Sequence, residues 1–318
     1  EFGIFGGEAG EYLLKLTERL RAPIVTTLHT VLADPTPDQR RVMEQLAEHS
    51  ARLVVMTEMG RTILTRNWNF PDEKIAVIPH GIPDVPFLDP AFQKHSFGLD
   101  GRKVALTFGL LSPNKGIENM IDALPELVRA HPDLTYVVLG ATHPHLVARE
   151  GEVYREKLQA QADALGVSDH LMFVNEYVDA PVLKNWLSAA DIYVTPYLHE
   201  AQITSGTLSY AVGLGKAVVS TPYWHARELL ANHVGALVPF GDPRALASTI
   251  GDLLTDNGRR DRLRAFAYDA GRQMIWPVVG RAYLDPLAEA RSGARAPAPV
   301  SNLRIGRRAP LISTLAAV

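Results

Sequence analysis

The sequence predicts an α/β protein with two domains, each built on a doubly wound parallel sheet. Short apolar segments alternate with amphipathic helical segments, and the apolar segments lack the polar alternation of a half-exposed strand. This rhythm is interrupted at residues 82–101. The length of 318 residues also fits about two domains of ordinary size.

Composition and charge narrow the class of protein. Apolar residues make up 47% of the chain and charged residues 21%, as in ordinary globular proteins. The formal net charge of −3 offers no broad positive field, so we expect no nucleic-acid partner. The chain has no cysteine, which excludes disulfides and a cysteine nucleophile, and we expect a cytoplasmic location. No apolar segment is long enough to span a membrane, while a peripheral membrane contact stays open.

The first domain is predicted over residues 1–88. Its clearest helix begins at Thr36, where Pro37 occupies the first turn and Gln39 completes a capping box. The segment opens with a strand end and a glycine loop, so we expect the chain to begin inside a domain. Apolar strands are expected at 22–29, 53–58 and 74–81.

The second domain is predicted over residues 102–270, after a proline-containing connection at 89–101. A further helix over 271–290 and an Ala-, Pro- and Arg-rich tail over 291–318 complete the chain. The expected strands lie at 103–109, 135–140, 171–175, 192–196, 217–221 and 236–239. The helices between them include 116–130, 151–165, 181–190 and 205–213.

A lysine stands at an unusual place after the first strand of the second domain. In TFGLLSPNKGIENMIDAL (107–124), Lys115 is expected at a helix start, where the helix dipole disfavours a cation. A bound anion would reverse this effect, because the lysine and the backbone N–H groups would attract the same ligand. Gly109 and Gly116 would let the backbone approach that ligand closely. The alternative is a solvated surface lysine, the commoner fate of a single lysine.

A second loop, at residues 197–223, supports an anion site. It follows an apolar strand and precedes an apolar helix. A helix needs only one Ser or Thr as its cap, and this loop carries more hydroxyl residues than a cap requires. The residues in question are Thr204, Ser205, Gly206 and Thr207. Because parallel strands present their carboxyl ends at one edge of the sheet, the two loops together predict a diphosphate held between them.

The order of the motifs resembles the family-4 retaining glycosyltransferases of the GT-B fold. The resemblance extends from His29 to about Trp276 and rests on IAVIPHG, LTFGLLSPNKGIENMIDAL, YVVLG, LSAADIYVTPY, GLGKAVVSTPYWHARELL and GALVPFGDPRALASTI. It implies two Rossmann-like domains facing across a cleft, an N-domain whose first strands are missing, and a helix at 271–290 that crosses back to the N-domain.

The same resemblance implies the activity. The enzyme would be a hexosyltransferase-like, metal-independent glycosyltransferase without a bound cofactor. It would move a sugar from a nucleotide sugar to a saccharide or glycoconjugate acceptor, with retention of anomeric configuration.

The resemblance and the two loops assign the site. His29, Lys115 and Glu200 are the expected catalytic residues. The expected donor-binding residues are Gly109, Lys115, Gln202, Thr204, Ser205, Gly206, Thr207 and Tyr210. Donors aimed at the leaving diphosphate are expected to contribute most to the rate, and these are Lys115 and the backbone N–H groups of residues 205–207.

Three positions depart from the family pattern. Leu110 stands where an arginine is common, and Gln202 and Tyr210 stand where the family has two glutamates separated by seven residues. Glu200 lies two residues from the first of these places, so Glu200 and Gln202 are both candidates for the contact with the sugar. We favour Gln202, because its spacing from Gly215 needs no gap.

Other function classes stay open. The departures motivate a non-catalytic protein that binds a nucleotide sugar, and the same fold serves nucleotide-sugar epimerases and sugar phosphorylases. A dinucleotide-dependent dehydrogenase is disfavoured, because GLGKAV (213–218) lacks the third glycine of that motif. His143 and His145 alternate with a proline on an expected loop and have no further ligands nearby in the sequence, so we expect no protein-bound metal.

Overall fold

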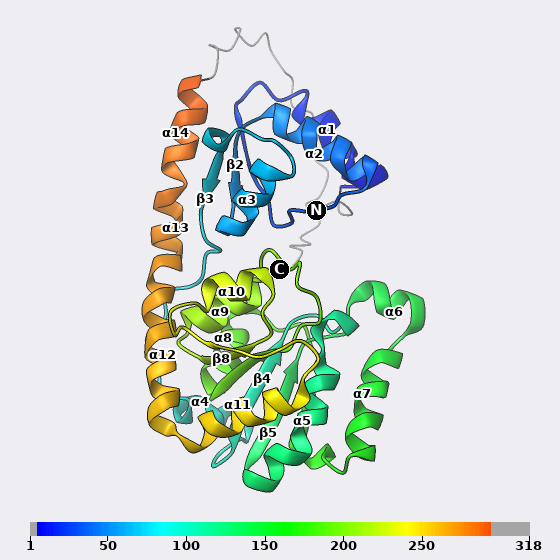
Figure 1. Cartoon of the computed structure of the whole chain (residues 1–318), viewed down its shortest axis with the longest axis vertical. Coiled ribbons are helices and arrows are strands. Elements are labelled where there is room, and N and C mark those ends of the chain that lie inside the picture. Colours follow the sequence, from blue (N-terminus) through cyan, green and yellow to red (C-terminus); the bar gives the residue numbers. More distant parts are fainter. Residues whose placement is uncertain (1–4, 294–318) are drawn as a thin grey trace, which may run out of the picture. The chain divides into compact units, whose positions relative to one another are not determined.

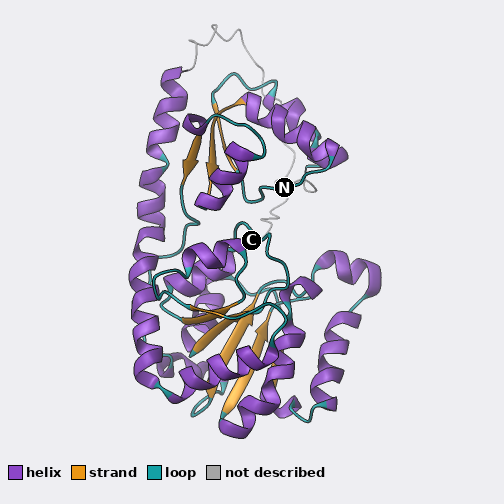
Figure 2. Cartoon of the chain, in the orientation of Figure 1, coloured by secondary structure: helices purple, strands orange, loops and turns teal. Residues whose placement is uncertain are grey.

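The computed structural model describes residues 5–293, and the chain divides into two compact units (Figures 1 and 2). Unit 1 comprises the residues up to Pro79 and those from Val279 onward, and unit 2 comprises His80–Val278. Most of the predicted tail, residues 294–318, lies outside the described residues. Every helix within residues 5–293 is too short or too polar to span a lipid bilayer.

Unit 1 contains a small parallel sheet in the described part of the chain. Its strands, in spatial order, are β1 (Ile24–Thr27), β2 (Ser50–Val55) and β3 (Ile75–Val77). Its helices are α1 (Tyr12–Thr17), α2 (Pro37–His49), α3 (Glu58–Arg66) and α14 (Leu284–Gly293), and α14 packs against β1 and β2. Val54, Ile78 and Val279 share an apolar cluster, so residues from both ends of the chain build this unit.

Unit 2 is built on a wider parallel sheet. Its strands are β4 (Lys103–Phe108), β5 (Leu134–Leu139), β6 (Leu171–Val174), β7 (Ile192–Thr195), β8 (Ala217–Ser220) and β9 (Ala236–Leu237). Across the sheet they follow the order β6–β5–β4–β7–β8–β9. The order runs outward in both directions from the β4–β7 pair, which is therefore a topological switch point. In sheets of this kind, ligands bind beyond the carboxyl ends of the strands at such a point.

Helices cover both faces of this sheet, which explains why its strands consist mainly of apolar residues (Figure 2). One face packs against α5 (Ile117–Ala130), α7 (Val153–Ala164) and α11 (Pro243–Thr255). The other packs against α8 (Ala180–Ala189), α9 (Gly206–Gly213), α10 (Trp224–Leu229) and α12 (Asn257–Gly271). Also present are α4 (Ala91–Lys94), within the predicted connection, α6 (Pro144–Glu150), and α13 (Trp276–Ala282), which spans the boundary between the units.

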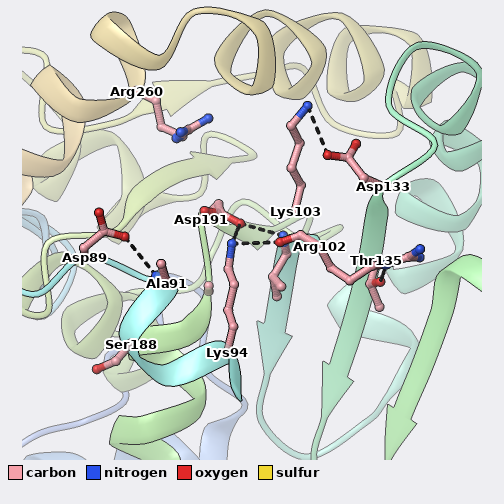
Figure 3. A network of polar contacts seen from close by, with 12 residues as sticks. Asp89, Ala91, Lys94, Arg102, Lys103, Asp133, Thr135, Ser188, Asp191 and Arg260 are labelled. Carbon is pink, nitrogen blue, oxygen red and sulfur yellow. Dashed lines mark hydrogen bonds and ion pairs between the residues drawn. The ribbon is translucent and has the colours of Figure 1, made fainter. Parts of the chain in front are cut away.

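Two lysines at the amino-terminal edge of the unit 2 sheet are paired with carboxylates (Figure 3). Lys94 Nζ donates to Asp191 Oδ2 at 2.7 Å and to the Arg102 carbonyl oxygen at 2.8 Å. The same Asp191 oxygen accepts a backbone N–H of β4 at 2.7 Å. Lys103, at the start of β4, pairs with Asp133 at 3.5 Å. These contacts fasten α4 to the starts of β4 and β7.

Candidate functional site

Glycines bring three loops together at the carboxyl edge of the unit 2 sheet. Gly109 follows β4 with a φ of +127°, and a side chain on Gly140, after β5, would meet the Gly109 carbonyl oxygen at 2.2 Å. Gly116 has a φ of +62°, and a side chain there would meet the carbonyl oxygen of Pro196, after β7, at 2.0 Å. Glycine permits both the backbone conformation and the close approach. The loops after β4, β5 and β7 therefore lie against one another beside the switch point.

Lys115 lies in a 3-10 turn, Pro113–Lys115, and not in the first turn of a helix. Gly116, in the left-handed conformation, separates this turn from α5, which begins at Ile117. The predicted local geometry of Lys115 is therefore wrong. Its side chain is nevertheless at the carboxyl edge of β4, because a side-chain carbon on Gly109 would lie 3.7 Å from Lys115 Nζ.

The half-buried Lys115 ammonium contacts a hydroxyl and an aromatic ring. Nζ donates to the Tyr197 hydroxyl at 2.8 Å and lies 4.2 Å from the centroid of the Tyr197 ring. No carboxylate within the described range 5–293 forms an ion pair with it. Lys115 thus lacks the counter-charge that Lys94 has, and a bound anion would supply one.

A chain of buried hydroxyls leads from Lys115 to the start of α9. The Tyr197 hydroxyl lies 3.0 Å from Thr207 Oγ1, which lies 3.0 Å from Ser205 Oγ. Ser205 Oγ also accepts the Leu208 N–H at 3.3 Å, so Ser205 caps α9. Burial alone would raise the pKa of Tyr197, but the charge and hydrogen bond of Lys115, with the neighbouring hydroxyls, hold it below its ordinary value.

His225, on α10, completes this group of residues. Its Nδ1 accepts the Ser205 N–H at 2.8 Å. Burial, with a smaller contribution from His80, lowers the pKa of His225 to about 3, so the ring is neutral and carries its proton on Nε2. We call Lys115, Tyr197, Thr207, Ser205 and His225 the Lys115 cluster.

Of the three backbone N–H groups expected to bind a phosphate at the start of α9, one has a partner within the described chain. The Ser205 N–H, which was expected to face a phosphate, is instead donated to His225. The N–H groups of Gly206 and Thr207 have no hydrogen-bond partner in the part of the chain that the structure describes. Such groups at a helix start are suited to an anion.

The side chains of Gln202 and Glu200, in the loop before α9, have partners outside the Lys115 cluster. Gln202 donates its side-chain amide to the Thr204 carbonyl oxygen at 2.6 Å. Glu200 is exposed and forms an ion pair with Arg227 of α10. Among residues 5–293, neither side chain bonds with the Lys115 cluster.

Tyr210 lies one turn after Thr207 on α9. Its ring packs edge-on against His80, with centroids 6.3 Å apart, and burial raises the pKa of Tyr210. His29 follows β1 and belongs to unit 1. The predicted residues that the structure brings together at the carboxyl edge are Gly109, Lys115, Ser205, Gly206 and Thr207.

Sequence reasoning missed Tyr197, Tyr193 and His225. Tyr197 follows β7 closely, so the rule that polar residues at the carboxyl ends of strands face the ligand would have selected it. The buried Tyr193 hydroxyl has no partner among the described residues, although Thr207 lies close enough to affect the pKa of Tyr193. His225 reaches Ser205 through tertiary folding, and no local pattern marks it.

The remaining histidine motif does not form a metal centre in the described chain. His143 and His145 stack with ring centroids 5.3 Å apart, and His143 Nδ1 accepts the His145 N–H at 3.3 Å. His145 lies on α6 and not on the expected loop. Within residues 5–293, no three His, Asp or Glu side chains are grouped as metal ligands.

Comparisons with known proteins agree with this arrangement. Residues 90–270 match the family Glycosyl transferases group 1, and residues 6–84 match Glycosyltransferase Family 4. The D-inositol 3-phosphate glycosyltransferase of Xylanimonas cellulosilytica is 30% identical over 294 residues, which cover 86% of this chain and 68% of that protein. The phosphatidyl-myo-inositol mannosyltransferase of Mycobacterium leprae is 28% identical over 260 residues, which cover 81% of this chain and 64% of that protein. The chain thus spans about two thirds of the length of these relatives.

Solved structures share the fold. Anabaena Alr3699/HepE in complex with UDP matches with a TM-score of 0.72 and 20% identity, over 88% of this chain and 75% of that chain. A glycosyltransferase from Rickettsia africae matches with a TM-score of 0.72 and 17% identity, over 88% of this chain and 74% of that chain. From the family match over more than half of its length, the chain belongs to the group 1 glycosyltransferases, and it has their GT-B type of α/β fold.

Proposed function

We propose that this enzyme moves a sugar from a nucleotide-activated donor to a saccharide or glycoconjugate acceptor, with retention of anomeric configuration, and that unit 2 holds the donor. The Lys115 cluster carries this proposal. It offers a half-buried cation that has no carboxylate partner among the described residues, beside the switch point of the sheet. The N–H groups of Gly206 and Thr207 lie at the start of the adjacent helix α9.

The cluster suits the charge that develops in this reaction. When the bond between the anomeric carbon and the donor oxygen breaks, negative charge remains on the diphosphate. Lys115 and the start of α9 would attract that charge, and stabilisation of this kind is usually the largest catalytic term. The acceptor oxygen would form its bond on the same face of the sugar, and the leaving phosphate would take the acceptor's proton. His29 stays a proposed catalytic residue, and Gln202 stays the candidate favoured over Glu200 for the contact with the sugar.

The names of the relatives support a nucleotide-sugar donor. The two sequence relatives above are named as a glycosyltransferase and a mannosyltransferase, and HepE was solved with UDP. None of these names describes an epimerase, a phosphorylase or a binding protein, so those alternatives gain no support. The absence of cysteine motivates the further proposal of a cytoplasmic location. We also propose that the enzyme has no bound cofactor, because the nucleotide sugar is a substrate that already carries the leaving group.

The proposal can be tested by removing the charge of Lys115. We expect the wild type to bind one of UDP, GDP and ADP in isothermal titration, and to release that nucleotide from its sugar donor when an acceptor is present. Lys115→Met should weaken binding roughly 10- to 100-fold, because a hydrogen bond to a charged group is lost. The free energy of unfolding should change by less than about 0.5 kcal/mol.

Lys157→Met is the matched control, because Lys157 is an exposed lysine on α7. It should bind the nucleotide as the wild type does. Unchanged binding and turnover in Lys115→Met would contradict the proposed donor site.

A further inference from the structure

We propose that Tyr197 is a positioning residue of the donor site: its hydroxyl aims the Lys115 ammonium at the diphosphate and links it to the start of α9. This inference rests on the proposed function, because it takes the Lys115 cluster as the place of the donor phosphates. Tyr197 does not itself need to touch the donor.

Tyr197 limits the positions that the Lys115 ammonium can take. An ammonium has three N–H groups, and Lys115 gives one of them to the Tyr197 hydroxyl at 2.8 Å. No acceptor in the described part of the chain takes the other two, so they remain for a ligand. A lysine side chain has many rotamers, so a fixed acceptor that selects one of them lowers the entropy lost when the ligand binds.

Tyr197 is itself held firmly by its neighbours. Its side chain is buried, and its ring stacks on Tyr223 with centroids 5.0 Å apart and an angle of 19° between the planes. A hydroxyl on such a ring has a defined position. Tyr197 is thus suited to orient a flexible lysine.

The direction of the hydrogen bonds links Lys115 to α9 through Tyr197. Because the Tyr197 oxygen accepts from Lys115, its own proton is available to Thr207 Oγ1, 3.0 Å away. Thr207 lies in the first turn of α9, next to the N–H groups proposed for the phosphates. One hydroxyl therefore couples the loop after β4 to the helix after β7.

The test uses the full chain, the nucleoside diphosphate that the wild type binds, and the matched variants Tyr197→Phe and Tyr136→Phe. Tyr136 is also fully buried and donates its hydroxyl to a buried threonine, Thr107, at 2.9 Å. Tyr197→Phe should weaken nucleotide binding about tenfold and lower kcat, because the ring stays and the lysine loses its acceptor. Tyr136→Phe should keep the nucleotide affinity and the kcat of the wild type.

A double-mutant cycle between Tyr197 and Lys115 distinguishes positioning of the lysine from a merely structural role of the tyrosine. If Tyr197 acts through Lys115, Tyr197→Phe should weaken binding about tenfold in the wild type and have no further effect in Lys115→Met. Equal weakening in both backgrounds would overturn the inference, and so would wild-type binding by Tyr197→Phe.

Failure of the proposed donor site and failure of a variant to fold can each be distinguished from failure of this inference. If Lys115→Met itself binds normally, the proposed donor site fails, whatever Tyr197 does. If Tyr197→Phe does not fold, Thr207→Val cuts the other end of the same hydrogen bond, and its effect should also disappear in the Lys115→Met background.

Discussion

Lys94 and Lys103 at the amino-terminal edge of the unit 2 sheet have different partners from Lys115 at the carboxyl edge. At the amino-terminal edge, Lys94 meets Asp191 at 2.7 Å and Lys103 meets Asp133 at 3.5 Å (Figure 3). At the carboxyl edge, Lys115 meets only the hydroxyl and the ring of Tyr197 among the described residues. Lys94 and Lys103 are thus held by carboxylates of the same unit, whereas Lys115 has no carboxylate partner among residues 5–293. We interpret Lys94 and Lys103 as structural lysines and Lys115 as the cation of the proposed donor site.

The largest expected effect comes from removing the ion pair between Lys94 and Asp191. Lys94→Met would leave the buried carboxylate of Asp191 without its cation, and we expect a loss of about 3–5 kcal/mol in the free energy of unfolding. Urea denaturation followed by circular dichroism measures this change. The double variant Lys94→Met/Asp191→Asn should recover part of it. If Lys94→Met cost no more than Lys115→Met, the two edges would not differ as described.

A pH effect of intermediate size is expected at Lys216, just before β8. Its buried ammonium donates to the carbonyl oxygens of Ser188 at 2.9 Å and Ala190 at 3.2 Å. Burial, followed by the positive charge of Arg264, lowers the pKa of Lys216 to about 7 from its ordinary 10.5. Between these two values the unfolded chain holds a proton that the folded chain has released. The free energy of unfolding therefore rises with pH, by up to about 1.4 kcal/mol per pH unit from this group.

Lys216→Met should remove this contribution. Denaturation at pH 7.5 and at pH 9.0, a range chosen inside the window of about 7 to 10.5, compares the slopes of the two proteins. Equal slopes in the wild type and the variant would show that Lys216 stays charged when buried.

The smallest effect is expected at Glu200. The side chains of Glu200 and Arg227 are 54% and 47% exposed, so their ion pair should contribute less than about 0.5 kcal/mol to stability. We expect Glu200→Gln to change kcat by less than about twofold, because Glu200 does not bond with the Lys115 cluster in the described structure. A large fall in kcat, with unchanged stability, would instead place Glu200 at the sugar.

Local patterns predicted the elements of the fold well. The strand expected at 135–140 is β5, Leu134–Leu139, because apolar runs between helices mark buried parallel strands. The capping box at Thr36 and Gln39 is confirmed, with hydrogen bonds of 3.3 and 2.9 Å, because it depends only on residues three apart.

The site was less predictable, because contacts between distant segments decide it. Gly116 takes its left-handed conformation beside the Pro196 carbonyl, and this ends the turn that holds Lys115 before α5 begins. The Ser205 N–H is donated to His225, which lies on another helix. Both outcomes depend on residues far along the chain, which patterns of neighbouring residues do not reveal.

The division of the chain has a consequence for folding during synthesis. Unit 2 is one continuous segment, His80–Val278, and its ends are joined where the Ile82 N–H donates to the Met274 carbonyl oxygen at 2.8 Å. Unit 1 needs segments from both sides of it, since Val279 packs in one cluster with Val54 of β2. On the ribosome, unit 2 can therefore finish folding before α14, which is made after it, covers β1 and β2. During that interval β1 and β2, which are made before unit 2, lack this cover and are exposed to aggregation.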